Sequence, residues 1–232
     1  MLNQIKGFLE TSFLDWPGKI VSVVFFPTCN FRCPYCHNHS LVLNPEQYET
    51  ISVEYILGCL SEFKNWVDGI CITGGEPTLH ASLFDIICKF KSHDFLIKLD
   101  TNGTNPAVLK DLIENRLVDY VSMDVKGPLD EIRYSRCSGV KVELNDIKES
   151  IKTLKEGTIP YEFRVTVVPT LITEDDIIDL AKQLSRADKF TLSNFNPSNP
   201  LDIHLKDVTP YDEEILKKLQ HRVDEIVKMP TD

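Results

Sequence analysis

Residues 20–38 have the sequence IVSVVFFPTCNFRCPYCHN, in which an apolar run leads directly into three cysteines spaced by four and three residues. Short runs rich in β-branched residues predict a strand. Cys29, Cys33 and Cys36 follow that strand, and three thiolates at this spacing can converge on one centre when the chain wraps as a loop. We therefore expect a metal site where the first predicted strand ends.

Two kinds of centre fit this spacing. A structural zinc site would use the three cysteines with His37 or His39 as the fourth ligand, and such sites are closed and four-coordinate. Zinc ligands usually come as two short pairs separated by a longer stretch, and no second pair follows here. A [4Fe–4S] cluster normally takes four cysteines, so three would leave one iron open to a substrate or cofactor. The spacing favours iron and leaves zinc as the alternative.

The rest of the chain alternates between strand and helix patterns. Strands are predicted at about 20–26, 69–73, 95–100, 119–125, 161–168 and 189–195. Helices are predicted at about 52–66, 80–92, 105–116, 143–156, 173–184 and 211–228. Strand–helix units in this order predict an α/β fold with a parallel sheet and right-handed crossovers.

The chain length decides which parallel fold to expect. A full eight-fold barrel needs about 250 residues, so six units in 232 residues predict a partial (β/α)6 barrel. A flat doubly wound sheet is the structural alternative. We expect one domain over 1–232, with its core at about 18–197 and a helical tail at about 198–232.

Charge and composition exclude several classes of protein. The formal net charge of −10 argues against nucleic-acid binding, which needs clustered Lys and Arg. The longest apolar stretch, 20–26, is far shorter than the roughly 20 residues of a membrane span. Residues 1–13 lack the pattern of a signal peptide, so we expect a cytoplasmic protein. The seven cysteines are odd in number and unevenly distributed along the chain, which suits a reducing compartment. The four outside the motif, Cys59, Cys71, Cys88 and Cys137, are expected to be buried apolar groups.

Polar or glycine-rich features also follow the other predicted strands. Thr73-Gly74-Gly75-Glu76-Pro77 follows the second strand, where two glycines let the backbone approach a ligand closely, although an ordinary turn would look the same. Asp100, Thr101 and Asn102 end the third strand. The carboxyl ends of parallel strands are where ligands bind in barrels and open sheets alike, so these residues are candidates for a binding site.

Later strands continue this pattern. Asp124 and Lys126 alternate at strand period and share one face, which is unusual on a parallel strand and indicates either a site or a structural ion pair. Arg164 is a charge within an otherwise apolar strand and could bind a carboxylate bidentately or close the edge of the sheet. Asn196 follows the last strand.

The CxxxCxxC motif, with aromatic Tyr35 before its last cysteine, resembles the signature of the radical S-adenosylmethionine superfamily. The resemblance implies a [4Fe–4S] cluster held by Cys29, Cys33 and Cys36. Its open iron would bind the amino and carboxylate groups of S-adenosylmethionine, and an electron would cleave that cofactor to methionine and a 5′-deoxyadenosyl radical. By the same resemblance, Tyr35 packs near the adenine.

The resemblance also implies roles for the other candidates. Gly74, Gly75 and Glu76 would hold the amino group of the methionine moiety. Asp100, with Thr101 and Asn102, would contribute to a cofactor and monovalent-cation site, and Lys126 would address the cofactor's carboxylate or ribose. The remaining cofactor-binding candidates are His37, Asp124, Arg164 and Asn196. Relatives often carry His or Arg where Asn196 stands, a departure from the family pattern.

Within that superfamily the chain resembles the glycyl-radical-enzyme activating branch. The likeness rests on the Asp15-Trp16-Pro17-Gly18 element, on Cys36-His37-Asn38, and on the segment 201–211. It is greatest to the short activating proteins of anaerobic ribonucleoside-triphosphate reductase. The implied partners are a glycyl-radical enzyme and a low-potential electron donor such as flavodoxin or ferredoxin. The alternatives are a small-molecule radical enzyme, such as 7-carboxy-7-deazaguanine synthase, and a noncatalytic zinc-binding module.

Overall fold

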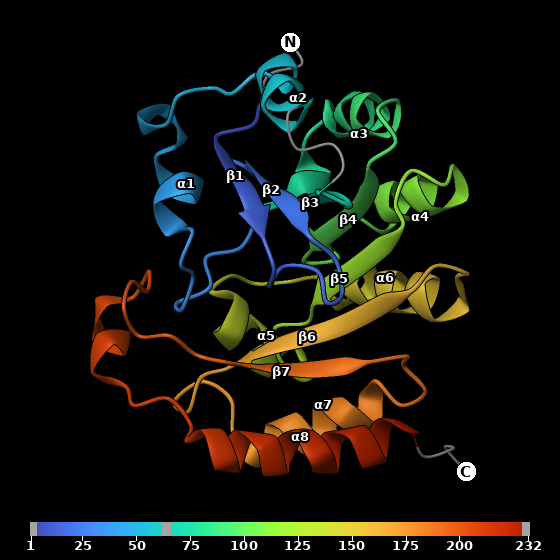
Figure 1. The fold of residues 1–232 in the computed structure, drawn as a ribbon. Helices are drawn as coiled ribbons and strands as arrows, with labels where there is room; N and C mark the ends of the chain where they lie inside the picture. The colour runs from blue at the N-terminus through green and yellow to red at the C-terminus, as the bar shows by residue number, and fades with distance from the viewer. Residues whose placement is uncertain (1–3, 62–65, 229–232) are drawn as a thin grey trace. The chain divides into compact units, whose positions relative to one another are not determined.

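The computed structural model describes residues 4–61 and 66–228 of the chain (Figure 1). The strands are β1 Gly7–Ser12, β2 Val21–Phe26, β3 Gly69–Gly74, β4 Leu96–Thr101, β5 Tyr120–Asp124, β6 Tyr161–Val167 and β7 Phe190–Asn194. The α-helices are α1 His39–Leu43, α2 Val53–Ser61, α3 Leu83–Lys91, α4 Pro106–Glu114, α5 Glu131–Ser138, α6 Leu144–Glu156, α7 Glu174–Gln183 and α8 Glu213–Lys228. Short 3₁₀ helices are η1 Pro45–Gln47, η2 Pro77–Leu79 and η3 Ile203–Asp207.

Over the described ranges, seven strands form one sheet whose order follows the chain from β1 to β7. The edge strand β1 is antiparallel to β2, whereas the pairs β2–β3, β3–β4 and β6–β7 are parallel. A doubly wound sheet reverses its strand order part-way along the chain. The observed order has no such reversal, which confirms the predicted α/β class with barrel-type strand order and removes the flat alternative.

Each predicted strand is present, with its ends within one residue of the prediction, and α2, α3, α4, α6, α7 and α8 match the predicted helices. Residues 62–65 of the predicted helix 52–66 lie outside the described residues. The simple alternation of one strand with one helix is wrong between β5 and β6, because α5 and α6 both lie there. Two further elements, β1 and α1, were not predicted: β1 leaves Leu9, Glu10 and Thr11 exposed, and α1 is only five residues long.

The described residues fall into two compact units, and the boundary runs through β5. Among the described residues, the first unit comprises 4–30, 40–61, 66–101 and 107–121, and the second comprises 31–39, 102–106 and 122–228. Each unit has its own apolar interior, so the two are described separately.

In the first unit, alternation along the strands separates two buried faces. Trp16, Val21, Val23 and Cys71 form an apolar cluster on one face, against which Phe25, Leu96 and Tyr120 pack. Successive side chains of a strand point to opposite faces, so Ile72 and Leu99, both fully buried, belong to the other face. The helix α3 buries one stripe, Leu83, Ile86, Ile87 and Phe90. Burial on both faces explains why β2 and β3 are nearly continuous apolar runs.

The cysteines outside the cluster motif do not all behave as expected. Cys71 and Cys137 are buried and Cys59 is partly exposed, but Cys88 is exposed. The expectation of burial is therefore wrong for Cys88, because it lies opposite the buried stripe of the amphipathic helix α3.

In the second unit, β6 alternates apolar residues with the charged pair Glu162 and Arg164. The helices α7 and α8 lie side by side along β7 (Figure 1). Each helix contributes an apolar stripe, with Ile177 and Leu180 buried on α7 and Val223 and Val227 on α8. A capping box begins α7, in which the Thr173 and Asp176 side chains accept from each other's backbone N–H.

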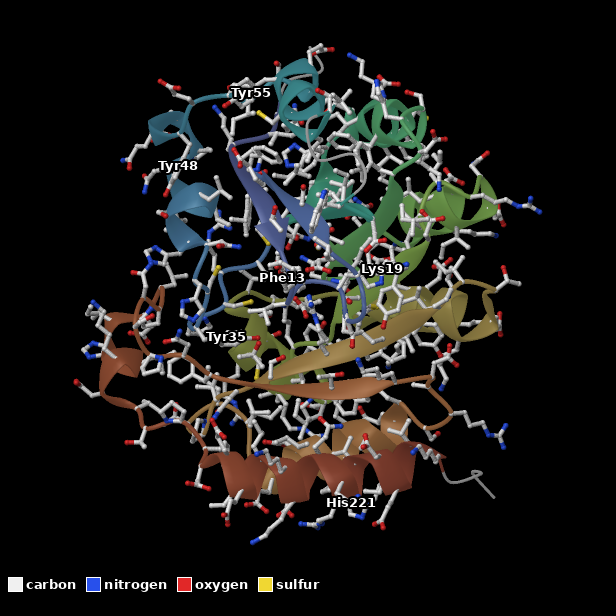
Figure 2. All side chains as sticks on the ribbon, viewed as in Figure 1. Phe13, Lys19, Tyr35, Tyr48, Tyr55 and His221 are labelled. Carbon is white, nitrogen blue, oxygen red and sulfur yellow. The ribbon has the colours of Figure 1, made fainter. Side chains whose placement is uncertain are left out.

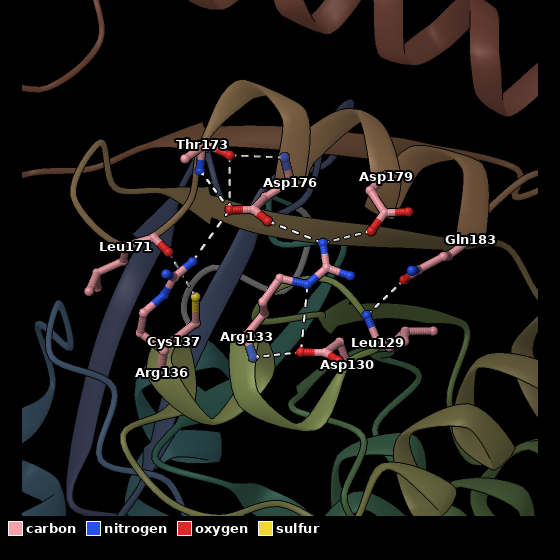
Figure 3. Close-up of polar contacts among 10 residues, drawn as sticks. All are labelled: Leu129, Asp130, Arg133, Arg136, Cys137, Leu171, Thr173, Asp176, Asp179 and Gln183. Atoms are coloured by element: carbon pink, nitrogen blue, oxygen red, sulfur yellow. Dashed lines mark hydrogen bonds and ion pairs between the residues drawn. The ribbon is translucent and has the colours of Figure 1, made fainter.

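An ionic network fixes α5 against α7 (Figure 3). Arg133 Nη1 lies 3.3 Å from Asp176 Oδ1 and 2.7 Å from Asp179 Oδ2, and Arg136 Nη2 lies 3.4 Å from Asp176 Oδ2. Asp130 caps α5 by accepting from the Arg133 N–H at 3.0 Å. The network matters for the site because α5 carries the residues that hold the cysteine loop.

Among the helices of the described ranges, none has the length and apolarity that crossing a bilayer requires.

Candidate functional site

The cysteine motif forms a loop that begins where β2 ends. Thr28, directly before Cys29, has a φ of 56°, which is strained for a β-branched residue. The Cys36 N–H donates to the Cys33 carbonyl at 3.0 Å, closing a turn over Pro34 and Tyr35. Cys33 is 8% exposed, while Cys29 and Cys36 are partly exposed. None of these three described cysteines takes part in a disulfide.

Helix α5 anchors this loop within the second unit. The Arg32 N–H donates to the Ser138 carbonyl at 2.9 Å. Gly139 ends α5 with a φ of 71°, and a Cβ there would lie 2.0 Å from the Arg32 carbonyl oxygen. Phe31 meets Tyr134 edge to face, with ring centroids 6.3 Å apart. The conformation of the loop is therefore fixed by a helix about a hundred residues later in the chain. The cysteine motif alone does not predict this contact.

The donor set fits a sulfur-ligated metal centre. Three thiols without disulfides are the ligands that iron–sulfur clusters and zinc both take. Among the residues that the structure describes, no three or more His, Cys, Asp or Glu side chains are gathered as a metal-binding group. The ligand roles of the cysteines thus rest on their donor chemistry and on family membership, reported below.

Charged side chains at and just after the end of β5 lie near Cys33 in the second unit, and one of them also pairs with β6. Burial raises the pKa of the Cys33 thiol, and the nearby Lys126 ammonium opposes that rise. Lys126 Nζ lies 3.5 Å from Asp124 Oδ2, and Arg164 Nε donates to Asp124 Oδ1 at 3.0 Å. Asp124 therefore pairs with two cations, and Asp124 and Lys126 both act on the pKa of Cys33.

Two tyrosines complete this group. Tyr35, marked in Figure 2, is 6% exposed and Tyr134 is fully buried. Burial raises the pKa of Tyr134, and it raises that of Tyr35 well above the ordinary value. Both rings therefore stay neutral and serve as packing surfaces beside Cys33.

The turn after β3 approaches the start of the cysteine loop within the first unit. The Gly75 N–H donates to the Phe26 carbonyl and the Glu76 N–H to the Thr28 carbonyl, both at 2.8 Å. A Cβ on Gly75 would lie 1.6 Å from the Thr28 carbonyl oxygen. Only glycine permits this approach, so Gly75 has a structural role in placing the chain that enters Cys29.

Glu76 is 1% exposed and holds the same turn. Its Oε1 accepts from the Thr78 N–H at 3.1 Å, from Thr78 Oγ1 at 2.5 Å and from Thr101 Oγ1 at 2.7 Å. Glu76 thereby links the turn after β3 to the end of β4. Its contacts with these hydroxyls indicate that it positions both strand ends.

The end of β4 carries an ion pair within the first unit. Lys98 Nζ pairs with Asp100 Oδ1, and the Lys98 side chain is fully buried. Asn102, which belongs to the second unit, forms an Asx turn in which its Oδ1 accepts from the Thr104 N–H at 3.0 Å.

Two predicted site residues are exposed. His37 is exposed. Asn196 is also exposed, and its Oδ1 accepts from the Ser198 N–H at 2.9 Å, which is a turn contact. Residues that the sequence did not single out are Lys98, Tyr134 and Gly139. Lys98 alternates with Asp100 along one strand, so the argument used for Asp124 and Lys126 could have found it.

Comparison with known proteins identifies the family. Residues 23–184 match the model of the Radical SAM superfamily. The chain belongs to this superfamily. Membership implies a [4Fe–4S] cluster and S-adenosylmethionine as cofactors of a radical SAM enzyme, and it favours iron over the zinc alternative.

Several named proteins are similar to this radical SAM chain in sequence or in fold. It is 35% identical over 218 residues to a Methanocaldococcus jannaschii protein whose name proposes a glycyl-radical enzyme activating role, covering 93% of this chain and 89% of the relative. It is 26% identical over 244 residues to the pyruvate formate-lyase-activating enzyme of Clostridium pasteurianum, covering 98% and 100%. The solved structure of Streptococcus suis SuiB bound to S-adenosylmethionine matches with a TM-score of 0.67 and 17% identity, over 88% of this chain and 48% of that one. This last likeness concerns the fold.

Proposed function

We propose that this radical SAM enzyme activates a glycyl-radical enzyme. It would cleave S-adenosylmethionine reductively to a 5′-deoxyadenosyl radical, which abstracts a hydrogen atom from a glycine of the partner. The observation that carries the proposal is the Methanocaldococcus jannaschii relative, because 35% identity extends over 93% of this chain and 89% of the relative. An alignment over both whole chains supports a shared role more strongly than a shared motif does.

The residues of the cysteine loop would hold the cluster. Cys29, Cys33 and Cys36 supply three thiolates and leave one iron for the cofactor. When bound, the cluster and S-adenosylmethionine supply the electron and the radical, while the protein supplies binding, orientation and electrostatics. Tyr35 would cover the loop with an uncharged ring.

Cations near the cysteines would bind the anionic part of the cofactor. The Lys126 side chain is 14% exposed and its ammonium is oriented by Asp124, which also accepts from Arg164. A charge-assisted contact from Lys126 to a carboxylate is stronger than a neutral hydrogen bond. Asp124 acts here as a positioning residue, because it holds both cations in place.

The turn after β3 and the end of β4 would bind the amino end of the cofactor. Gly75 brings backbone groups close without a Cβ, and buried Glu76 ties the turn to Thr101. Asp100 would add a carboxylate at the same strand end. In this proposal Glu76 and Thr101 set the geometry of the turn.

The proposed partner is anaerobic ribonucleotide reductase, with flavodoxin or ferredoxin as the electron donor. A glycine substrate on a protein loop must be ordered on binding, which costs about 1–2 kcal/mol per residue fixed. Capture therefore needs contacts with the partner's surface beyond the loop itself. A short glycine peptide is accordingly a poor substrate.

The test mixes the reduced, cluster-loaded protein with S-adenosylmethionine and the candidate partner under anaerobic conditions. Electron paramagnetic resonance should show a glycyl doublet, with 5′-deoxyadenosine formed in step. Cys33→Ala should lose both signals and its iron, whereas Cys88→Ala, at an exposed position on α3, should retain them. No doublet with any glycyl-radical enzyme of the same genome, together with turnover of a free purine precursor, would reject the proposal in favour of small-molecule chemistry.

A further inference from the structure

A fully buried lysine lies beside Asp100 on β4. The Lys98 side chain has no exposed surface, the Asp100 side chain is 11% exposed, and the two form an ion pair. They are two residues apart on one strand, so both point to the same face. Lysine is almost never fully buried unless it is paired. The ion pair is therefore an integral part of the folded sheet.

The neighbours of Lys98 explain why its charge is directed to Asp100. Cys71 stands opposite Lys98 in the β3–β4 register, and Lys98 Nζ lies 3.8 Å from Cys71 Sγ. Cys71 belongs to the apolar cluster that contains Val21 and Val23. Along this side the ammonium meets weakly polar sulfur and hydrocarbon, which solvate a charge poorly. The Asp100 carboxylate supplies the compensating charge.

This pair changes what the end of β4 can bind. The family resemblance predicts a monovalent cation near Asp100. An alkali ion held by this carboxylate would lie close to the Lys98 ammonium, and two like charges repel strongly at short range in a low-dielectric interior. The end of β4 therefore does not fit an additional cation.

We propose that the Lys98 ammonium takes the place of a monovalent cation at Asp100, so that this chain is independent of Na⁺ and K⁺ at that position. The tethered ammonium neutralises the carboxylate at any salt composition, whereas a free ion would do so only above its dissociation constant. Lys98 is thus a positioning residue that keeps Asp100 in place. The inference concerns the folded protein and stands whether or not the proposed partner is correct.

The first test measures thermal unfolding of the wild-type protein in Na⁺, K⁺, NH₄⁺ or tetramethylammonium chloride at equal ionic strength. Tetramethylammonium is too large to enter a buried cation site. The expected melting temperatures agree within about 1 °C. A saturable rise in Na⁺ or K⁺ that is lost in Asp100→Asn would overturn the proposal.

The second test removes the tethered charge. Lys98→Ala leaves both the carboxylate and a space, and Lys98→Met leaves the carboxylate but fills the space. Both should melt about 10 °C below wild type, because removing one partner of a buried pair is strongly destabilising in a chain of this size. Only Lys98→Ala should recover in K⁺, Na⁺ or NH₄⁺. Lys110→Ala, at an exposed pair with Glu114, is the control and should not respond.

The outcomes separate the proposal from a simple packing role. Recovery of Lys98→Ala by small cations but not by tetramethylammonium supports the exchange of one cation for another. A folded Lys98→Ala that melts like wild type, or that ignores the cation, contradicts it. If Lys98→Ala does not fold, the wild-type comparison decides, together with Lys98→Arg, which keeps the charge and should remain insensitive to the cation.

Discussion

Replacing Gly75 by Ala tests whether the turn after β3 fixes the chain that enters the cysteine loop. A Cβ on Gly75 would lie 1.6 Å from the Thr28 carbonyl oxygen and 2.5 Å from its carbonyl carbon. Both are backbone atoms, so rotating a side chain cannot relieve the contact. Real Cβ contacts essentially never fall below 3.0 Å, and one of the two segments must therefore move by about 1.4 Å.

The cost of that movement follows from the contacts that it breaks. The hydrogen bonds from Gly75 N–H to Phe26 and from Glu76 N–H to Thr28 are both 2.8 Å long, and each contributes about 1 kcal/mol net. Overpacking a well-filled site adds about 1–3 kcal/mol. The total of about 3–5 kcal/mol lowers the melting temperature of a chain of this size by about 10 °C.

The measurement is thermal unfolding of the apoprotein by calorimetry, followed by iron content after anaerobic reconstitution. Gly58→Ala is the matched control: the residue is inside α2, and apart from that helix's own backbone and the two chain neighbours, no heavy atom of the described residues lies within 4 Å of the added Cβ. Replacing glycine by alanine in a helix contributes about 1 kcal/mol, so this control should melt at or above the wild-type temperature. Gly75→Ala should melt lower and bind less iron.

A Gly75→Ala protein that melted within 2 °C of wild type, with full iron content, would refute this reasoning. That result would mean that the backbone at Thr28 yields at little cost. A lower melting temperature with unchanged iron content would confirm the contact while removing its link to the cysteine loop.

Two further predictions concern charged groups. Lys126→Met should retain its iron but bind S-adenosylmethionine at least about 30-fold more weakly, since losing one partner of a charged contact costs about 2–5 kcal/mol. Calorimetric titration measures the affinity, with Lys110→Met as the control. If Lys126→Met and Lys110→Met bound the cofactor equally well, Lys126 would have no role beyond its ion pair. Burial raises the pKa of Glu162, but hydrogen bonds from Lys189 and Ser122 outweigh it and hold the pKa below the usual 4.5. A lowered folded-state pKa stabilises the protein above pH 4.5, and this stabilisation is lost as pH falls through that pKa. Urea unfolding should therefore show Glu162→Gln less stable than wild type at pH 7, with the difference shrinking below pH 4.5, and a gap independent of pH would contradict the linkage.

The strands could be predicted from the sequence because burial on both faces leaves a continuous apolar run. Residues 20–26 and 69–73 are of this kind, and β2 and β3 appear within one residue of them. The edge strand β1 could not be predicted in this way, since it is exposed at Leu9, Glu10 and Thr11 and pairs on one side only. Its formation depends on β2, which no local pattern in 7–12 expresses.

The candidate site likewise contains residues that could be predicted from the sequence and residues that could not. Asp124 and Lys126 stand out because charges at strand period need a partner, and both lie close enough to Cys33 to act on its pKa. Lys98 has the same signal through Asp100 and could have been found by the same argument. Tyr134 and Gly139 could not, because their contacts with Phe31 and Arg32 join segments about a hundred residues apart.

The contact between Gly75 and Thr28 also sets a rule for protein engineering. A cysteine loop transplanted alone onto another parallel scaffold would arrive without the glycine turn against which its entry is packed. A Cβ on Gly75 would lie only 1.6 Å from the Thr28 carbonyl oxygen, so the two segments are packed against each other as one module. They form this module although Gly75 follows Thr28 by 47 residues in the chain. A designer would therefore have to move residues 26–29 and 73–76 together, or build a new turn to the same close approach.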